Sequence, residues 1–198
     1  EVLGSLEKSH WLGTLQNIHF ENNSLGNWQQ QARSKLAITP QRIELQQLCL
    51  HAQPDATLCV DGSKDVLSHD WQTTASLHAL PLSTLTAAVG LPWSLSGSLH
   101  SRIQAQGKQQ RITSGQVSAE TQELRLNTPI KDGALQQLSW QSNRLNASYN
   151  NDQLQLALDS QLDAQNTLRA SIHQTTADLL AGLKNRPIKG TVDLHVQN

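Results

Sequence analysis

The feature that most constrains this chain is an alternation of apolar and polar residues that repeats along its second half. A period of two places successive side chains on opposite faces of a strand, and it cannot be laid on one face of a helix. Residues 94–105 give the clearest case, with polar residues such as Ser98, His100 and Arg102 at the even positions. The opposite face of this strand is expected to carry Leu95, Gly97, Leu99, Ile103 and Ala105.

The same period returns several times before residue 198, which indicates a series of strands rather than one. Turn-forming residues separate the segments, as in Lys131-Asp132-Gly133 and Tyr149-Asn150-Asn151-Asp152. Strands joined by short turns predict an antiparallel meander. The further apolar sets are Leu124 and Leu126; Leu145, Ala147 and Tyr149; Leu154, Leu156 and Leu158; Leu168, Ala170 and Ile172; and Ile188, Gly190, Val192, Leu194 and Val196.

The first half of the chain is less regular, although short alternating sets occur there, such as Leu36 with Ile38 and Ala75 with Leu77. One segment has a helical spacing instead. Leu82, Leu85, Ala88 and Val89 fit a short helix that starts near Ser83 or Thr84 and stops at Gly90. A second, weaker helical pattern covers Thr176–Leu183.

The composition bears on whether the apolar faces close on each other. Hydrophobic residues make up 37% of the chain but aromatic residues only 4%. Closed sandwiches draw on aromatic and β-branched side chains to fill the space between two sheets. We therefore expect an all-β fold of one elongated, curled antiparallel meander sheet with one or two short helices. It would span residues 1–198 as a single segment, with a possible subdivision near residues 79–93. The alternative is a closed β-sandwich or β-solenoid module that binds a protein or glycan.

The two cysteines flank a turn signal at Pro54. If Pro54 marks the middle of a hairpin, Cys49 faces Cys59 and Leu50 faces Leu58 across the two strands, which makes a disulfide feasible. Such bridges persist in oxidising compartments, so the pair favours a periplasmic or extracellular location. The alternative is two buried free thiols in a cytosolic protein.

The search for chemistry finds no enzyme motif. There is no Walker loop, dinucleotide fingerprint or nucleophile elbow, and the eight histidines are dispersed. Solvated surface histidines are favoured over metal ligands, and the five tryptophans are too widely spaced for a stacking platform. A net charge of −1 gives no basic field for nucleic acid, and no run approaches the ~20 apolar residues that span a bilayer. We expect neither catalysis nor a cofactor.

One stretch, residues 41–105, resembles the TamB family of AsmA-like proteins. The elements that carry the resemblance follow one another in the order that this family has. They are Leu48-Cys49-Leu50 with Leu58-Cys59-Val60-Asp61-Gly62, then Asp70-Trp71, Leu80-Pro81-Leu82-Ser83-Thr84-Leu85, and Leu95-Ser96-Gly97-Ser98-Leu99.

The resemblance implies a middle portion of a long periplasmic protein that is anchored in the inner membrane of a Gram-negative bacterium. It implies a partner in the outer membrane, the Omp85-class protein TamA, and a β-taco whose concave apolar groove moves phospholipid or supports outer-membrane protein assembly. The residues expected to contact acyl chains in that groove are Leu95, Leu99, Ile103, Leu124, Leu126, Leu145, Leu154, Leu156, Leu158, Leu168, Ile172, Val192 and Leu194.

Overall fold

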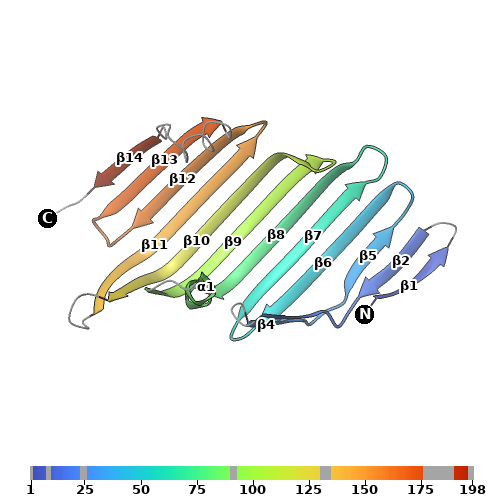
Figure 1. Ribbon diagram of the computed structural model, residues 1–198, viewed down its shortest axis with the longest axis horizontal. Helices are drawn as coiled ribbons and strands as arrows, with labels where there is room; N and C mark the ends of the chain where they lie inside the picture. The colour runs from blue at the N-terminus through green and yellow to red at the C-terminus, as the bar shows by residue number, and fades with distance from the viewer. Residues whose placement is uncertain are drawn as a thin grey trace.

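The computed structural model describes residues 2–7, 10–22, 26–89, 93–129, 135–175 and 190–195. These residues form one open antiparallel sheet of 14 strands and one short helix, α1 (Leu82–Val89) (Figure 1). The all-β prediction is confirmed. No second sheet occurs among the described residues, so neither a closed sandwich nor a solenoid is the fold.

The strands are β1 (Val2–Glu7), β2 (His10–Leu15), β3 (His19–Asn22), β4 (Gly26–Gln30), β5 (Ser34–Ile38), β6 (Arg42–Ala52), β7 (Ala56–Asp65), β8 (Asp70–Pro81), β9 (Ser94–Lys108), β10 (Arg111–Pro129), β11 (Leu135–Asn150), β12 (Gln153–Gln161), β13 (Thr167–Thr175) and β14 (Gly190–His195).

The sheet is a meander in which chain order and spatial order almost coincide. From β5 to β14 each strand pairs with the next strand along the chain. The turn predicted at residues 149–152 is present, with Asn151 and Asp152 both at positive φ between β11 and β12. The predicted turn at residues 131–133 and the predicted helix at Thr176–Leu183 lie outside the described residues.

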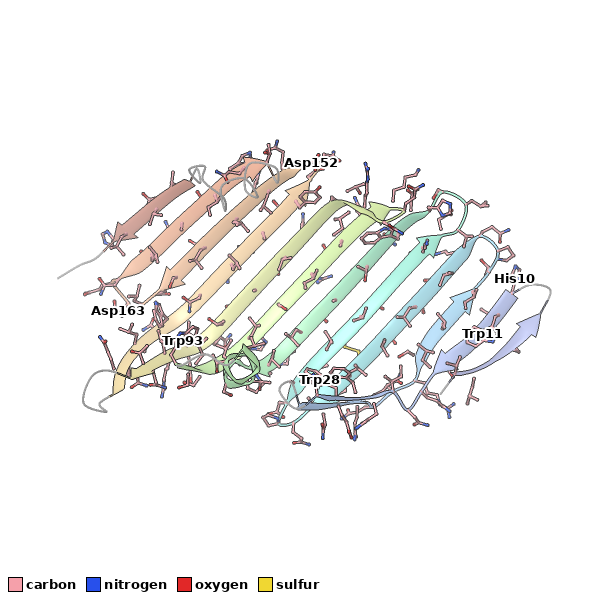
Figure 2. All side chains as sticks on the ribbon, in the orientation of Figure 1. His10, Trp11, Trp28, Trp93, Asp152 and Asp163 are labelled. Atoms are coloured by element: carbon pink, nitrogen blue, oxygen red, sulfur yellow. A yellow bond between two sulfur atoms is a disulfide. The ribbon has the colours of Figure 1, made fainter. Side chains whose placement is uncertain are left out.

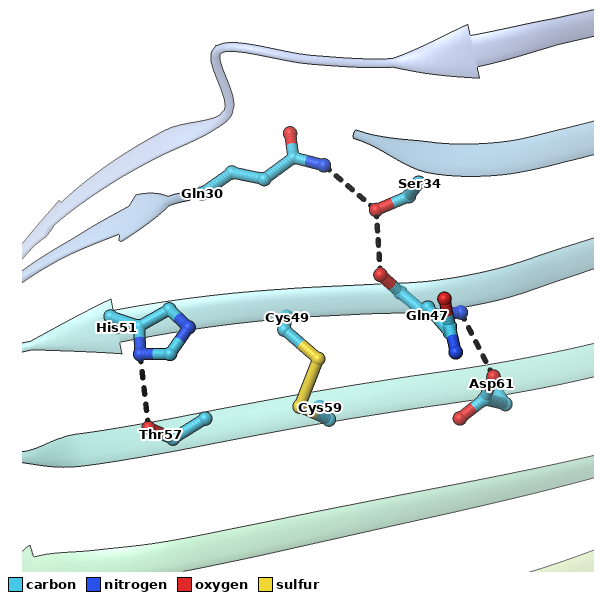
Figure 3. The surroundings of a disulfide bond; sticks show 8 residues. All are labelled: Gln30, Ser34, Gln47, Cys49, His51, Thr57, Cys59 and Asp61. Carbon is cyan, nitrogen blue, oxygen red and sulfur yellow. Dashed lines mark hydrogen bonds between the residues drawn. A yellow bond between two sulfur atoms is a disulfide. The ribbon is translucent and has the colours of Figure 1, made fainter. Parts of the chain in front are cut away.

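The exception to chain order is a junction on one side of β6. Here β5 pairs with the first half of β6 and β4 pairs with its last three residues, while β3 pairs with β4. Gln30 at the end of β4 and Ser34 at the start of β5 bridge the gap (Figure 3). The Gln30 amide donates to Ser34 Oγ (2.7 Å) and to the Leu15 carbonyl (3.0 Å), and the fully buried Ser34 donates to the Gln47 carbonyl (2.9 Å).

Four shifts of register interrupt the long strands, one of them between Ile112 and Ser114 of β10. In each of the other three, a residue with positive φ lies within the shift: Gln47 in β6 (φ 54°), Ala79 in β8 (φ 53°) and Glu123 in β10 (φ 52°). A bulge bends its strand and increases the local twist. The sheet is therefore not a flat ladder.

The predicted helix is confirmed as α1, which follows β8 directly and packs at the lower end of β8 and β9 in Figure 1. Its residue Leu85 packs against a small core of Trp28, Ala56 and Leu80. The segment expected to divide the chain, residues 79–93, holds this helix, and β8 and β9 on either side of it pair directly with each other.

The cysteine prediction is also confirmed. Cys49 and Cys59 lie opposite each other in β6 and β7 and form a disulfide, and Leu50 lies opposite Leu58 (Figure 3). Their Cα atoms are 4.0 Å apart.

Candidate functional site

The candidate site is one whole face of the sheet. The strand registers place one apolar residue from each strand between β6 and β13 in a single row across the molecule. We call this side the apolar face. The row consists of Leu48, Val60, Ala75, Ile103, Val117, Ala147, Leu156 and Ile172.

Most of the residues expected to contact acyl chains lie on this face. Ile103, Leu156 and Ile172 belong to the row above, and strand alternation and register assign the others to neighbouring rows. The expected contact residues on the apolar face are Leu99, Ile103, Leu145, Leu154, Leu156, Leu158, Leu168, Ile172, Val192 and Leu194.

Leu95, Leu124 and Leu126 are the expected contacts that the structure does not bring to this face. Leu126 lies opposite both Leu95 and Leu138, and alternation along β11 assigns Leu138 to the opposite side from Leu145. The single face expected for residues 94–105 therefore ends between Leu99 and Leu95. The physical reason is the bulge of β10 against β9, opposite which Gly97 adopts φ 116°.

Within the described residues, much of the apolar face is uncovered. The buried apolar residues among the described ones are Trp28, Ala56, Leu80 and Leu82, which all lie near α1 or β4. Elsewhere, large side chains on this face remain exposed, with Ile103 at 41%, Leu145 at 40% and Val192 at 71% of their maximal accessible area. Contiguous apolar surface of this kind marks a site of interaction with lipid, protein or another apolar ligand.

One end of the apolar face has a defined border. Over β6 to β9 this border consists of Trp28, which lies opposite Ala52, and of α1, which packs near Leu80 and Leu99. Next to Leu99, the same row continues through Thr121, Asn143 and Ser160 on β10, β11 and β12. We call these three residues the polar row.

Three of the five tryptophans are packing residues. Trp28 is buried in the core, and Trp71 lies flat against Gly107 and donates from its indole to the Gln109 carbonyl (3.1 Å). Trp11 covers Gly4 and Gly13 in the same way. Trp11 and Trp28 lie far apart along the sheet, as Figure 2 shows, and each of the three residues packs against its own neighbours.

The opposite face is polar over most of its extent, apart from Leu95, Leu124, Leu126 and Leu138 at one end, and we call it the polar face. Two hollows of about 500 and 780 Å³ lie on it, and Gln104, Gln116, Ser148 and Gln155 line both of them. Amide and hydroxyl side chains thus contribute to the lining of both hollows.

A row of alternating charges crosses the polar face from β10 to β14. Arg144 lies 3.8 Å from the Glu120 carboxylate and Arg169 lies 3.1 Å from the Asp159 carboxylate. Opposite charges on neighbouring strands stabilise the register in which they face each other. The members, in spatial order, are Glu120, Arg144, Asp159, Arg169 and Asp193.

The titratable groups give no sign of a reaction centre in the described residues, where no group of three or more His, Cys, Asp or Glu side chains could hold a metal ion. His78 and His100 form a pair, with Nδ1 atoms 2.9 Å apart, on the polar face. Hydrogen bonds from Ser68 lower the pKa of Asp65, and hydrogen bonds from Asn166 and Gln165 lower the pKa of Asp163. Both aspartates stabilise turns.

The sequence analysis missed the polar row. Thr121, Asn143 and Ser160 are ordinary strand residues by composition, and 22 and 17 positions separate the hydrogen-bonded pairs. The signal that could have found them is the hydroxyl or amide that replaces an aliphatic residue at the expected apolar position of each strand.

A comparison with protein families decides the chain's relationship. A family model described as the N-terminal domain of TamB matches residues 1–198. The chain belongs to the TamB family. No curated protein and no solved structure matches it. The match extends the resemblance of residues 41–105 over the whole chain, and its description names the N-terminal domain where a middle portion of a TamB-family protein was expected.

Within the described residues of this TamB-family chain, α1 is too short to cross a bilayer and no other helix could do so. The apolar face is the candidate functional surface.

Proposed function

We propose that this chain is a non-catalytic segment that binds phospholipid acyl chains on its apolar face and carries them between the inner and outer membranes. The observation that supports this proposal is the series of half-buried and exposed apolar side chains on one side of a single open sheet, from β6 to β14. Membership of the TamB family, which is associated with the cell envelope, lipid transport and outer-membrane assembly, supports it independently.

The physical argument concerns the free energy of an acyl chain outside the membrane. Each CH₂ group gains about 0.8 kcal/mol when it leaves water for an apolar surface. A surface of Leu, Ile, Val and Ala side chains offers a free energy similar to that of the bilayer interior. The apolar face therefore lowers the barrier that water presents without trapping the lipid, and this function needs neither a catalytic residue nor a cofactor.

The same surface suits the assembly of outer-membrane proteins, because nascent strands of such proteins also have one apolar face. We propose a periplasmic location, with an anchor in the inner membrane and contact with TamA provided by other parts of the full-length protein. The disulfide between Cys49 and Cys59 supports an oxidising compartment.

Photo-crosslinking in cells tests this function with matched neighbours on one strand. Leu156 and Gln155 are adjacent on β12 and lie on opposite faces, and Leu145 and Arg144 form a second pair on β11. We expect a photo-crosslinking residue at Leu156 or Leu145 to give phospholipid adducts, and the same residue at Gln155 or Arg144 to give none.

The adducts distinguish the two roles within the family. Adducts to outer-membrane proteins at the leucine positions, without lipid, would favour assembly over lipid transport. Equal adducts on both faces, or none at any of the four positions, would contradict a selective apolar binding surface.

A further inference from the structure

The polar row marks the level at which the apolar surface begins on β10 to β12. On β11 the residues of this face run from Gln137, Ser139 and Gln141 through Asn143 to Leu145, Ala147 and Tyr149, so that the strand changes from polar to apolar after Asn143. The two neighbouring strands repeat the pattern, with Thr121 on β10 and Ser160 on β12 beside Asn143. Three adjacent strands therefore change from polar to apolar at the same level.

A directed chain of hydrogen bonds joins the three side chains. Ser160 Oγ donates to Asn143 Oδ1 (2.5 Å), and Asn143 Nδ2 donates to Thr121 Oγ1 (3.1 Å). Ser160 is buried, at 6% exposure, and its donor is satisfied. Asn143 and Thr121 are half-buried and open to a ligand.

This direction leaves two donors unused. An asparagine amide has two N–H groups and a threonine hydroxyl has one O–H. Within the described residues, one amide proton of Asn143 and the hydroxyl proton of Thr121 meet no acceptor. Both donors lie at the edge of an apolar surface, where a hydrogen bond to a ligand oxygen is stronger than it would be in water.

The border at this end supports one orientation for an amphiphile. Over β6 to β9, Trp28 and α1 cover the level of Leu80 and Leu99, whereas over β10 to β12 the same level holds the polar row. Beyond the polar row the apolar face continues along β11 for six residues from Asn143 to Tyr149, or about 20 Å at ~3.4 Å per residue. An acyl chain fits this length only if its polar end lies at one end of the series.

We propose that the polar row binds the ester or phosphate oxygens of a phospholipid, whose acyl chains extend along β10 to β12 toward Gly115, Tyr149 and Leu154. This inference rests on the proposed function, because it assumes that phospholipid occupies the apolar face. It adds the site of the polar end and the direction of the chains. In Figure 2 the polar end corresponds to the Asp163 end of β12 and the chain ends to its Asp152 end.

Spin-labelled phosphatidylglycerol tests the orientation on the 198-residue chain. One probe carries the nitroxide on its headgroup and the other carries it at the end of an acyl chain. We expect the headgroup label to broaden the amide NMR signals near Asn143 and Ser160 most, and the chain-end label to broaden those near Tyr149 and Leu154 most.

The outcomes of this experiment distinguish the orientation of the lipid from the proposed function on which it rests. The reverse pattern, or equal broadening at both ends of β11 by both probes, would overturn the orientation while leaving acyl-chain binding intact. Absence of broadening anywhere on the apolar face would overturn the proposed function and this inference together.

Two nearly isosteric variants test the donors themselves. Thr121→Val removes the hydroxyl donor, and Asn143→Asp removes the amide donors while keeping the oxygen that accepts from Ser160. We expect the double variant to bind phosphatidylglycerol about tenfold more weakly, the loss that corresponds to two modest hydrogen bonds. Asn146→Asp, on the polar face of the same strand, adds the same charge and is the control.

A hydrocarbon probe without ester or phosphate provides the second readout. Binding of hexadecane to the double variant should equal binding to the unmodified chain. If phosphatidylglycerol and hexadecane lose affinity equally, or if Asn146→Asp weakens phosphatidylglycerol binding as much as the double variant does, the polar row does not bind the polar end.

Discussion

Gln30 connects three strands of the N-terminal part of the sheet through its side chain. Besides its bonds to Ser34 and to the Leu15 carbonyl, its Oε1 accepts from the Ile18 backbone N–H (3.3 Å). These partners lie where β4 and β5 separate along β6 and where backbone pairing is incomplete. One amide side chain therefore replaces several bonds that a regular ladder would supply.

We predict that Gln30→Ala lowers the free energy of unfolding by about 1–3 kcal/mol, because it leaves half-buried polar groups without partners. Urea denaturation followed by circular dichroism measures the change. Gln46→Ala is the matched control, since exposed Gln46 bonds only to the Glu44 side chain, and it should change stability by less than about 0.5 kcal/mol. Equal effects of the two substitutions would contradict the role of the junction.

The disulfide is a second contribution of individual residues to the stability of the fold. Replacing Cys49 and Cys59 with alanine should lower the free energy of unfolding by about 2–3 kcal/mol, because the bridge closes a short loop and restricts the unfolded chain. A reducing agent should shift the urea midpoint of the unmodified chain by the same amount and leave the double variant unchanged. A midpoint that does not respond to reduction would show that β6 and β7 are held by their pairing alone.

Asp163 gives a prediction on pH. Hydrogen bonds from Asn166 and Gln165 lower its pKa below the ordinary 3.8, so the charged form is favoured in the folded state. The contribution of the charged carboxylate to the free energy of unfolding is fully present above pH 3.8. It is lost as the pH falls through the lowered pKa of Asp163. Asp163→Ala should therefore destabilise the chain at neutral pH, and the difference in urea midpoint should shrink well below pH 3.8. A constant difference across this range would contradict a charged turn.

Single residues also show which contacts could be predicted from the sequence and which could not. Pro54 centres the hairpin between Cys49 and Cys59, so counting outward from it predicts the disulfide. The contact between Thr121 and Asn143 depends instead on the exact register of β10 and β11, which are long strands with many near-equivalent pairings. Local sequence does not specify such a register, because the energy of the whole ladder decides it.

At the scale of elements, the bulges decide which side chains share a face. Ala79 shifts the register just before α1 begins, and Glu123 shifts it opposite Gly97. Neither Ala79 nor Glu123 carries a turn signature, and alanine and glutamate rarely adopt positive φ. The sequence therefore predicted the strands and α1 correctly but extended the apolar face to Leu95, Leu124 and Leu126.

A substitution at Gly97 tests whether this bulge interrupts the alternation of β9. Its φ of 116° is disfavoured for other residues, and a Cβ there would lie 2.7 Å from the Gln122 carbonyl oxygen. Gly97→Ala should lower the free energy of unfolding by about 1–3 kcal/mol, measured by urea denaturation. Ser96→Ala, at the exposed neighbour, should be nearly neutral. A neutral Gly97→Ala would mean that the alternation of β9 continues without a break.

At the scale of the whole molecule, the accessible surface area shows how open the sheet is. The chain exposes 13582 Å², whereas a compact protein of 21.8 kDa exposes about 9300 Å². The excess reflects a single layer whose two faces both remain accessible. Length and composition could not predict this openness, although the low aromatic content favoured it.

Small-angle X-ray scattering tests the shape in solution. A compact chain of 198 residues has a radius of gyration of about 16 Å, and the open sheet should give a clearly larger value at low protein concentration. A value near 16 Å for the monomer would indicate that the sheet closes on itself. The disulfide variant should give the same value as the unmodified chain, because the bridge joins strands that are already paired.

The order of the strands has a consequence for how such proteins change length during evolution. Because each strand from β5 to β14 pairs with its neighbour in the chain, duplication of one hairpin inserts two strands without altering the partners of the others. Barrels and sandwiches lack this freedom, since an added strand disturbs their closure. A gene that encodes this architecture can therefore be lengthened in small steps, two strands at a time, without a change in the rest of the fold.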